Sequence, residues 1–197
     1  MKKGKFIVFY GINNLGKSTQ AEILINHLKK EGIKAEYLKY PIYDLKPTGP
    51  FINKVLRSGK KQEISEEELQ MWYTLNRFQY EPKLKAKLEK VIWIIAEDYI
   101  GTGLAWGWAK GANLEYLENM NRPLLSEDLA ILFIGKRFMD GKEEKHLHEE
   151  NDNLMIKCQG KHLLLGKKYH WRKISANGSR EEVAEKIWKV VEKEFNL

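Results

Sequence analysis

A glycine-containing stretch near the start of the chain, FYGINNLGKSTQAEIL at 9–24, has residue types and spacing that could bind phosphate. Gly11 and Gly16 let successive backbone N–H groups turn toward one anion, and a following helix adds the positive end of its dipole. The Lys17 ammonium can then reach β- and γ-phosphates, and the Ser18 hydroxyl can ligate Mg²⁺. The GxxxxGK[ST] spacing therefore predicts a triphosphate-binding loop; the alternative is a glycine turn without a ligand.

The elements around this loop must position it. An apolar run, KFIVFY at 5–10, precedes the loop, and the segment after it has apolar residues at helical spacing up to Gly32. Strand, loop and helix in this order are the context in which the motif binds nucleotide phosphates. The residues of this loop expected to line the triphosphate site are Gly11, Asn13, Asn14, Leu15, Gly16, Lys17, Ser18 and Thr19.

Further apolar runs alternate with helical patterns along the rest of the chain. They occupy 34–41, 91–98, 129–134 and 169–175. Strands that are apolar throughout and alternate with helices are typical of a parallel sheet covered on both faces. We expect an α/β fold in a single domain over 1–197, because this length suffices for one sizeable core.

Two other segments have sequence patterns that predict their local structure. Ser65 followed by Glu68 has the spacing of a capping box, and it predicts the start of a long helix that bends near Pro82. The region at about 135–168 is the least apolar part of the chain. It is either a lid over the phosphate site or a solvated pair of helices.

Two acidic residues, Glu97 and Asp98, stand where the third apolar run ends. Ligand sites in open parallel sheets lie at the carboxyl ends of strands, so Glu97 is a candidate for orienting Mg²⁺ or its waters. The alternative is an acidic pair that caps a turn.

Tyr73 and Arg77 lie one turn apart on the expected long helix. An aromatic ring and a guanidinium on one helix face could stack on a base and hydrogen-bond its edge. Taken alone, a tyrosine and an arginine one turn apart are more often a packing contact.

The composition of the chain limits the classes of partner and the cellular location that we expect. The formal charge of +7 suits any polyanion, but the lysines alternate with glutamates, which favours solvated helix faces over a nucleic-acid groove. Cys158 is the only cysteine, so no internal disulfide can form and a reducing, cytoplasmic location is expected. The N-terminal apolar run is too short for a signal peptide, and no segment approaches the length of a membrane span.

Several segments together resemble the thymidylate kinase family of P-loop kinases in order and spacing, from Lys5 to Phe195: GKSTQAEIL, YPIYDLKPTGPFINKVL, LQMWYTLNRFQ, EDYIGTGLAWG and ISANGSREEVAEKI. The resemblance implies a P-loop nucleotide kinase fold, with a five-stranded parallel sheet flanked by helices and a lid. It implies ATP and Mg²⁺ on the donor side and a pyrimidine deoxynucleoside monophosphate, such as dTMP, as acceptor. It also suggests a homodimer with the long helix at the interface.

The same resemblance assigns residues. Lys17, Glu97 and Asp98 take the catalytic positions, with Ser18 and Glu97 toward the metal. The ATP site gains Arg137, Ala176 and Asn177. The residues placed around the acceptor are Asn13, Tyr43, Phe51, Tyr73, Asn76, Arg77, Asp98, Tyr99, Thr102 and Trp106.

Three positions depart from the family pattern on the acceptor side. Asn13 replaces an aspartate, Ile42 stands where an arginine usually meets the acceptor phosphate, and Asp98 replaces the arginine of an Asp-Arg-Tyr motif. Asn13 and Asp98 can also be one paired change that conserves local charge. Cations that could compensate are Lys39, Lys46, Arg137 and Lys142.

These departures keep three functions open. The first is a dTMP kinase; the second is a deoxynucleoside kinase in which Asp98 or Glu97 takes the proton of a 5′-hydroxyl. The third is a non-catalytic protein that binds nucleotides or nucleic acid. His146, His148 and Glu149 are expected to be solvated rather than to form a metal site.

Overall fold

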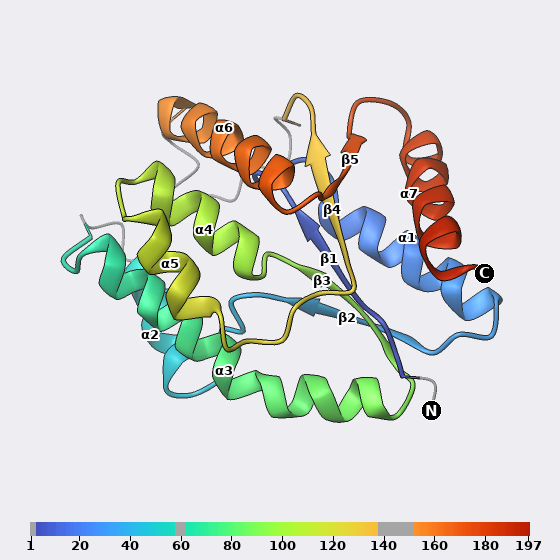
Figure 1. Ribbon diagram of the computed structural model, residues 1–197, viewed down its shortest axis with the longest axis horizontal. Helices are drawn as coiled ribbons and strands as arrows, with labels where there is room; N and C mark the ends of the chain where they lie inside the picture. Colours follow the sequence, from blue (N-terminus) through green and yellow to red (C-terminus); the bar gives the residue numbers. More distant parts are fainter. Residues whose placement is uncertain (1–2, 58–61, 138–151) are drawn as a thin grey trace.

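The computed structural model describes residues 3–57, 62–137 and 152–197. Its centre is a five-stranded parallel sheet in the order β2-β3-β1-β4-β5 (Figure 1). The strands are β1 (Phe6–Tyr10), β2 (Ala35–Lys39), β3 (Trp93–Glu97), β4 (Leu129–Ile134) and β5 (Arg172–Ser175). The expected α/β fold with a five-stranded parallel sheet is confirmed.

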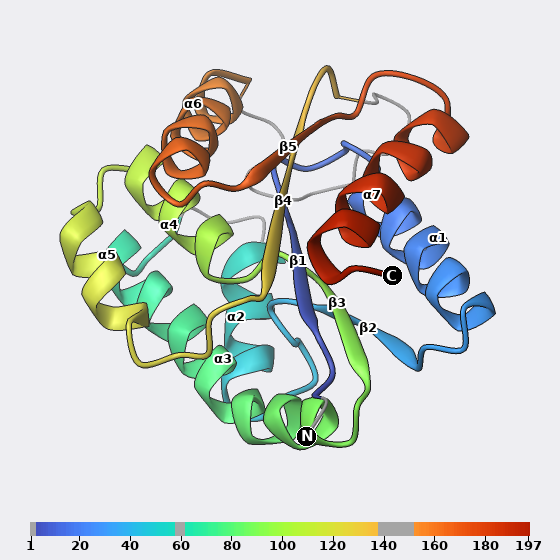
Figure 2. The same ribbon diagram turned by 45° about the vertical axis from the view of Figure 1, so that its right-hand side comes forward.

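Helices cover both faces of this sheet. They are α1 (Lys17–Lys30), α2 (Thr48–Arg57), α3 (Glu66–Glu89), α4 (Ile100–Ala109), α5 (Leu114–Asn121), α6 (Asp152–Lys168) and α7 (Arg180–Phe195). Helices α1 and α7 lie on one face, and α3, α4, α5 and α6 lie on the other (Figures 1 and 2). This two-sided cover explains why the strands are apolar throughout.

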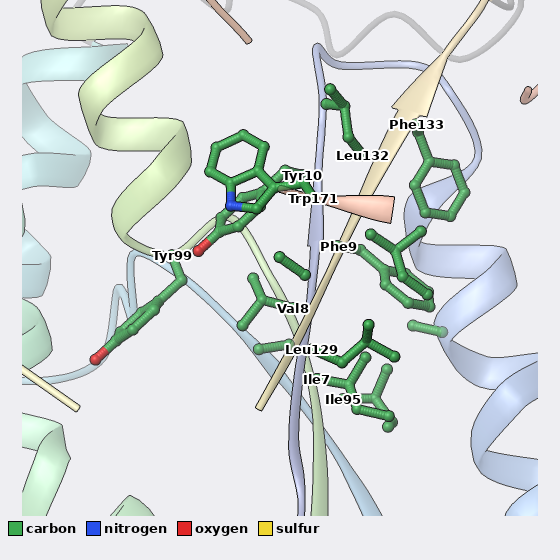
Figure 3. Close-up of a cluster of buried hydrophobic side chains, with 14 of the residues drawn as sticks. Ile7, Val8, Phe9, Tyr10, Ile95, Tyr99, Leu129, Leu132, Phe133 and Trp171 are labelled. Atoms are coloured by element: carbon green, nitrogen blue, oxygen red, sulfur yellow. The ribbon is translucent and has the colours of Figure 1, made fainter. Parts of the chain in front are cut away.

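The central strand β1 is completely buried. Because successive side chains of a strand point to opposite faces, β1 contributes to two halves of the core. Figure 3 shows Phe9 near Phe133 on the α1 side and Val8 and Tyr10 on the α4 side. The ring centroids of Phe9 and Phe133 are 5.0 Å apart, and Tyr10 stacks on Trp171 at 4.3 Å. This core fixes the strand end from which the glycine loop leaves.

The expected start of the long helix is confirmed. The Ser65 hydroxyl accepts a hydrogen bond from the Glu68 N–H at 3.1 Å, and α3 then runs without interruption past Pro82 to Glu89. Ser179 and Glu182 form a complete capping box at the start of α7. Both caps set the direction of a helix that borders the site described below.

The segment expected to form a lid is partly a packed helix. Residues 138–151, with Lys142, His146, His148 and Glu149, lie outside the described residues. After them, α6 packs against α4 and buries Met155, Cys158, His162 and Leu165 along one face. The lid assignment of 138–151 stays a prediction. Among the described residues, no helix has both the length and the apolar character required to span a membrane.

Candidate active site at the carboxyl ends of the strands

A cavity of about 960 Å³ lies where the loop after β1, the end of β3 and helices α3 and α4 meet. This is the edge of a parallel sheet at which ligands are expected. Its size is at the upper end of the range for small-molecule sites. The lining residues include Asn13, Asn14, Leu15, Gly16, Lys17, Ser18, Thr19, Tyr43, Tyr73, Arg77, Glu97, Asp98, Thr102, Trp106 and Ala176.

The glycine loop curls around the Lys17 side chain. Lys17 Nζ donates to the carbonyl oxygens of Gly11 at 3.1 Å and Ile12 at 2.9 Å. Gly16 has φ 77° and Gly11 has φ 131°, both in the region that favours glycine. A Cβ atom on Gly11 would also lie 2.8 Å from the Phe133 carbonyl oxygen. These two glycines are therefore required by the path of the loop.

Donor groups in the loop fit a phosphate. Helix α1 begins directly after Gly16, which has no side chain to cap it, so the N-cap residue leaves the N-terminal N–H groups of the helix open to a ligand. The buried amide nitrogen Nδ2 of Asn14 has no hydrogen-bond partner among the described residues, and Asn14 lines the cavity. Unpaired buried donors beside a helix N-terminus match the chemistry of an anionic oxygen.

The carboxylate of Asp98 lies against the same lysine. Asp98 follows β3 with φ 59°, and its Oδ1 lies 3.7 Å from Lys17 Nζ. The Thr102 hydroxyl donates to the same oxygen at 3.1 Å. The left-handed backbone at Asp98 is uncommon for a residue other than glycine, and such conformations concentrate at functional sites.

Two side chains of the neighbouring strand β2 contact the Glu97 carboxylate. Its side chain is 2% exposed, the Tyr37 hydroxyl donates to Oε1, and Lys39 Nζ lies 3.9 Å from Oε2. Lys39 pairs with Glu97 in the parallel register, so Tyr37, two residues earlier, points to the same face of β2. Burial, followed by the bond to Glu97, raises the pKa of the Tyr37 hydroxyl. Glu97 is therefore fixed in orientation at the cavity wall.

These oxygens fit a magnesium ion that is shared with a nucleotide. Ser18, Glu97 and Asp98 all line the cavity. In the described part of the chain, no three His, Cys, Asp or Glu side chains converge. A metal here would take most of its ligands from phosphate and water, as Mg²⁺ does in nucleotide sites.

The opposite end of the cavity is formed by one face of α3. Tyr73 and Arg77 both line it, as expected, and burial raises the pKa of Tyr73 and lowers that of Arg77. Arg77 Nη1 donates to Asn121 Oδ1 at 2.9 Å, and its guanidinium lies 5.9 Å from the centre of the Tyr99 ring. Asn121 thus holds one end of the guanidinium, while Nη2 lies beside Gly103, which lines the cavity.

Three residues expected at the acceptor do not line the cavity. Phe51 stacks on Trp72 at 4.2 Å. Asn76 is completely buried and bonds both the N–H and the carbonyl of Ile42, which fixes the segment after β2. Tyr99 has no exposed surface because it packs beneath Arg77. In the structure these three side chains lie in the layer that supports the cavity wall.

The loop before α7 contributes through its backbone. Ala176 lines the cavity, and its N–H donates to the Ile134 carbonyl at 2.7 Å. The Asn177 side chain accepts from the Lys136 N–H at 3.0 Å and does not line the cavity, and neither does Arg137. Asn177 therefore joins this loop to the end of β4.

The cavity wall also contains residues that the sequence patterns did not single out. Gln70, Arg57 and Arg180 line it, and Lys39, considered as a compensating cation, does so too. Lys46 does not, and Lys142 lies outside the described residues. The sequence feature that could have identified Gln70 is its position one helical turn before Tyr73. Five cationic and two acidic side chains thus line the described cavity, a balance that favours anionic ligands.

Comparisons with known proteins agree on one family. The family model for thymidylate kinase matches residues 9–187. The probable thymidylate kinase of Thermococcus onnurineus is 29% identical over 203 residues, covering 96% of this chain and 98% of that protein. The human thymidylate kinase is 27% identical, covering 94% and 89%. The Plasmodium falciparum enzyme is 31% identical, but the match spans only 65% of this chain and 60% of that protein.

A solved structure has the same fold. The thymidylate kinase of Candida albicans superposes with a TM-score of 0.82 at 22% sequence identity, over 98% of this chain and 93% of that one. At this identity the likeness concerns the arrangement of the helices and strands.

Proposed function

Because the chain belongs to the thymidylate kinase family, we propose that it transfers the γ-phosphoryl group of ATP to dTMP, giving dTDP and ADP. The observation that carries this proposal is the single cavity that joins the glycine loop to the Tyr73–Arg77 face of α3. A donor and an acceptor nucleotide bound at its two ends would have their phosphates next to Lys17.

On the donor side, the backbone of the loop from Gly11 to Ser18 and the Lys17 ammonium would hold the ATP phosphates. Ser18 and Glu97 would hold Mg²⁺, which when bound neutralises phosphate charge. The Ala176 loop would lie beside the adenine. The unpaired Asn14 amide and the uncapped start of α1 support this assignment.

The transfer itself would depend on position and charge. The attacking group is an acceptor phosphate oxygen, which is already anionic and needs no strong base. Lys17 is fixed by two carbonyl groups of the loop, so its charge would stabilise the transferring group without reorganising. Asp98 would position Lys17 from the opposite side.

On the acceptor side, Tyr73 would stack on the base and Arg77 would bond its edge. Arg57 supports binding of the acceptor phosphate, because it lines the cavity and its guanidinium lies 5.4 Å from the centre of the Tyr43 ring. Arg57 and Lys39 would thus supply the positive charge that the family's arginines usually provide at the positions of Ile42 and Asp98.

The position of Asp98 also favours a second candidate function. A carboxylate in the cavity next to Lys17 could take the proton of a nucleoside 5′-hydroxyl, and a neutral nucleoside would not be repelled by it. In that case the enzyme would convert a deoxynucleoside into its monophosphate.

The release of ADP, coupled to NADH oxidation, tests these functions with dTMP, dUMP, dCMP and thymidine as acceptors. We expect turnover with dTMP and dUMP that requires Mg²⁺. Turnover with thymidine alone would support the second candidate, and the absence of turnover with every acceptor would contradict both.

The same proposal includes a homodimer formed through α3. Met71 and Leu75, one turn apart on this helix, are each 46% exposed, which supports an apolar contact there. Sedimentation of wild type and of Leu75→Glu would test the dimer, since the charge should dissociate it. A cytoplasmic location also belongs to the proposal, supported by the single, buried cysteine.

A further inference from the structure

We propose that Gln70 determines base specificity at the acceptor end of the cavity. Its carbonyl oxygen, oriented by a chain of contacts from Lys110 through Glu66, would accept the ring N–H of thymine or uracil beside Arg77. The site would therefore reject cytosine. This inference rests on the proposed function and deepens it, because it concerns the choice of pyrimidine at the same site.

Gln70 has the right location. It lies on α3 one turn before Tyr73 and two turns before Arg77, so the three side chains share one face of the helix. All three line the cavity, and Gln70 is only 2% exposed. A polar side chain so deeply buried requires partners for both ends of its amide.

The orientation of the amide follows from its neighbour. Gln70 Nε2 lies 2.7 Å from Glu66 Oε1, and a carboxylate only accepts hydrogen bonds. The NH₂ group must therefore face Glu66. Lys110 donates to the other oxygen of Glu66 at 2.9 Å, and these two side chains are only 15% and 10% exposed. This ion pair holds the Glu66 carboxylate in place.

The carbonyl end of Gln70 is consequently available to a ligand. Its Oε1 lies on the Gly103 side of the amide, because Nε2 faces Glu66. A methyl group added at Gly103, on α4, would lie 3.1 Å from this oxygen and 2.6 Å from Arg77 Nη2. The acceptor of Gln70 and a donor of Arg77 therefore converge on the space above Gly103, which also lines the cavity.

An adjacent acceptor and donor match the edge of an imide base. In thymine and uracil, the N3–H would donate to Gln70 Oε1 while the neighbouring O4 accepts from Arg77. Cytosine has an acceptor at N3 and an amino group at position 4. With the ring fixed on Tyr73, cytosine would place acceptor against acceptor and donor against donor, and both mismatches would be buried.

The ratio of kcat/KM for dUMP to that for dCMP measures this discrimination, because the two nucleotides differ only at this edge. We expect wild type to prefer dUMP by about 100-fold or more, and Gln70→Leu to lower the ratio by about tenfold or more. Gln70→Met serves as a second variant of similar length, and circular dichroism verifies the fold of each.

Two further variants distinguish a loss of base recognition from a nonspecific effect of substitution on α3. Gln79, also on α3, bonds Thr48 and the Lys46 carbonyl and does not line the cavity, so Gln79→Leu should leave the ratio unchanged. Glu66→Gln removes the group that dictates the amide orientation, so it should lower the ratio although Gln70 is intact. An unchanged ratio in Glu66→Gln would overturn the orienting role of Glu66.

The result that would overturn this inference differs from the result that would overturn the proposed function. Turnover of dTMP by wild type, with the same dUMP:dCMP ratio in folded Gln70→Leu and Gln70→Met, would overturn this inference alone. Absence of turnover with both dTMP and dUMP in wild type would overturn the proposed function, and this inference with it.

Discussion

Lys17 and Asp98 face each other across the phosphate end of the cavity, with 3.7 Å between Nζ and Oδ1 and side chains that are 5% and 15% exposed. Lys17 is the first residue of α1, directly after the glycine loop that follows β1, and Asp98 directly follows the neighbouring strand β3. The contact joins the expected ATP site to Asp98, the position at which an acidic residue replaces an arginine of the family pattern. Both residues therefore invite direct tests.

Lys17→Met should lower kcat for dTMP by about 100- to 1000-fold, because it removes a fixed positive charge from the transferring phosphoryl group. The melting temperature should change little, since the methionine side chain fills the same space. Steady-state kinetics and thermal unfolding measure the two effects. Lys29→Met, at the exposed end of α1, is the matched control. Activity of Lys17→Met within tenfold of wild type would contradict the role of Lys17.

Asp98→Arg should raise kcat/KM for dTMP relative to thymidine by about tenfold or more. The change removes a negative charge and adds a positive one near the acceptor phosphate, where a single pair at 4 Å is worth roughly 4 kcal/mol at an effective dielectric constant of 20, before screening. The kinetic constants for both acceptors provide the measurement. If neither acceptor is affected, Asp98 has no part in acceptor choice.

Gly103→Ala should raise KM for dTMP by about tenfold or more, with a smaller effect on kcat. The new methyl group would lie 2.6 Å from Arg77 Nη2 and would force the guanidinium out of position. Gly160→Ala is the matched control on α6, because nothing lies within 4 Å of its added Cβ. An unchanged KM in Gly103→Ala would show that Arg77 does not contact the acceptor.

His162 should make the protein less stable in acid. Burial lowers the pKa of this histidine to about 4, compared with about 6.5 in the unfolded chain. Between these values the unfolded state binds the proton and the folded state does not, so the free energy of unfolding falls as pH decreases from 6.5 to 4. The loss should approach about 3 kcal/mol.

Urea unfolding at several pH values measures this loss. His162→Leu, which cannot titrate, should show a flatter dependence on pH over the same interval, whatever its absolute stability. Identical slopes for the two proteins would mean that His162 is not the responsible group.

The phosphate loop and the sheet could be predicted from the sequence because each depends on local pattern. Gly11, Gly16, Lys17 and Ser18 have one fixed spacing, and the apolar strands follow from a sheet that is covered on both faces. The start of α3 was equally local, because Ser65 and Glu68 are only three residues apart.

The acceptor end was harder to predict because its residues act across tertiary contacts. Whether Asn76 faces a ligand or bonds the backbone of Ile42 depends on how α3 packs against the segment after β2. The amide orientation of Gln70 depends on Lys110, which is 40 positions away in the chain. Helix α6 was ambiguous because its buried residues are separated by exposed polar ones and include His162.

The most direct test of the central claim is to identify the products when the purified protein is mixed with ATP, Mg²⁺ and dTMP. Anion-exchange chromatography should show one dTDP formed for each ADP, no dTDP when dTMP is omitted, and dTDP formation slowed by about 100- to 1000-fold when Lys17 is replaced by methionine. ADP release without dTDP, or formation of dTMP from thymidine with no use of dTMP itself, would contradict the account.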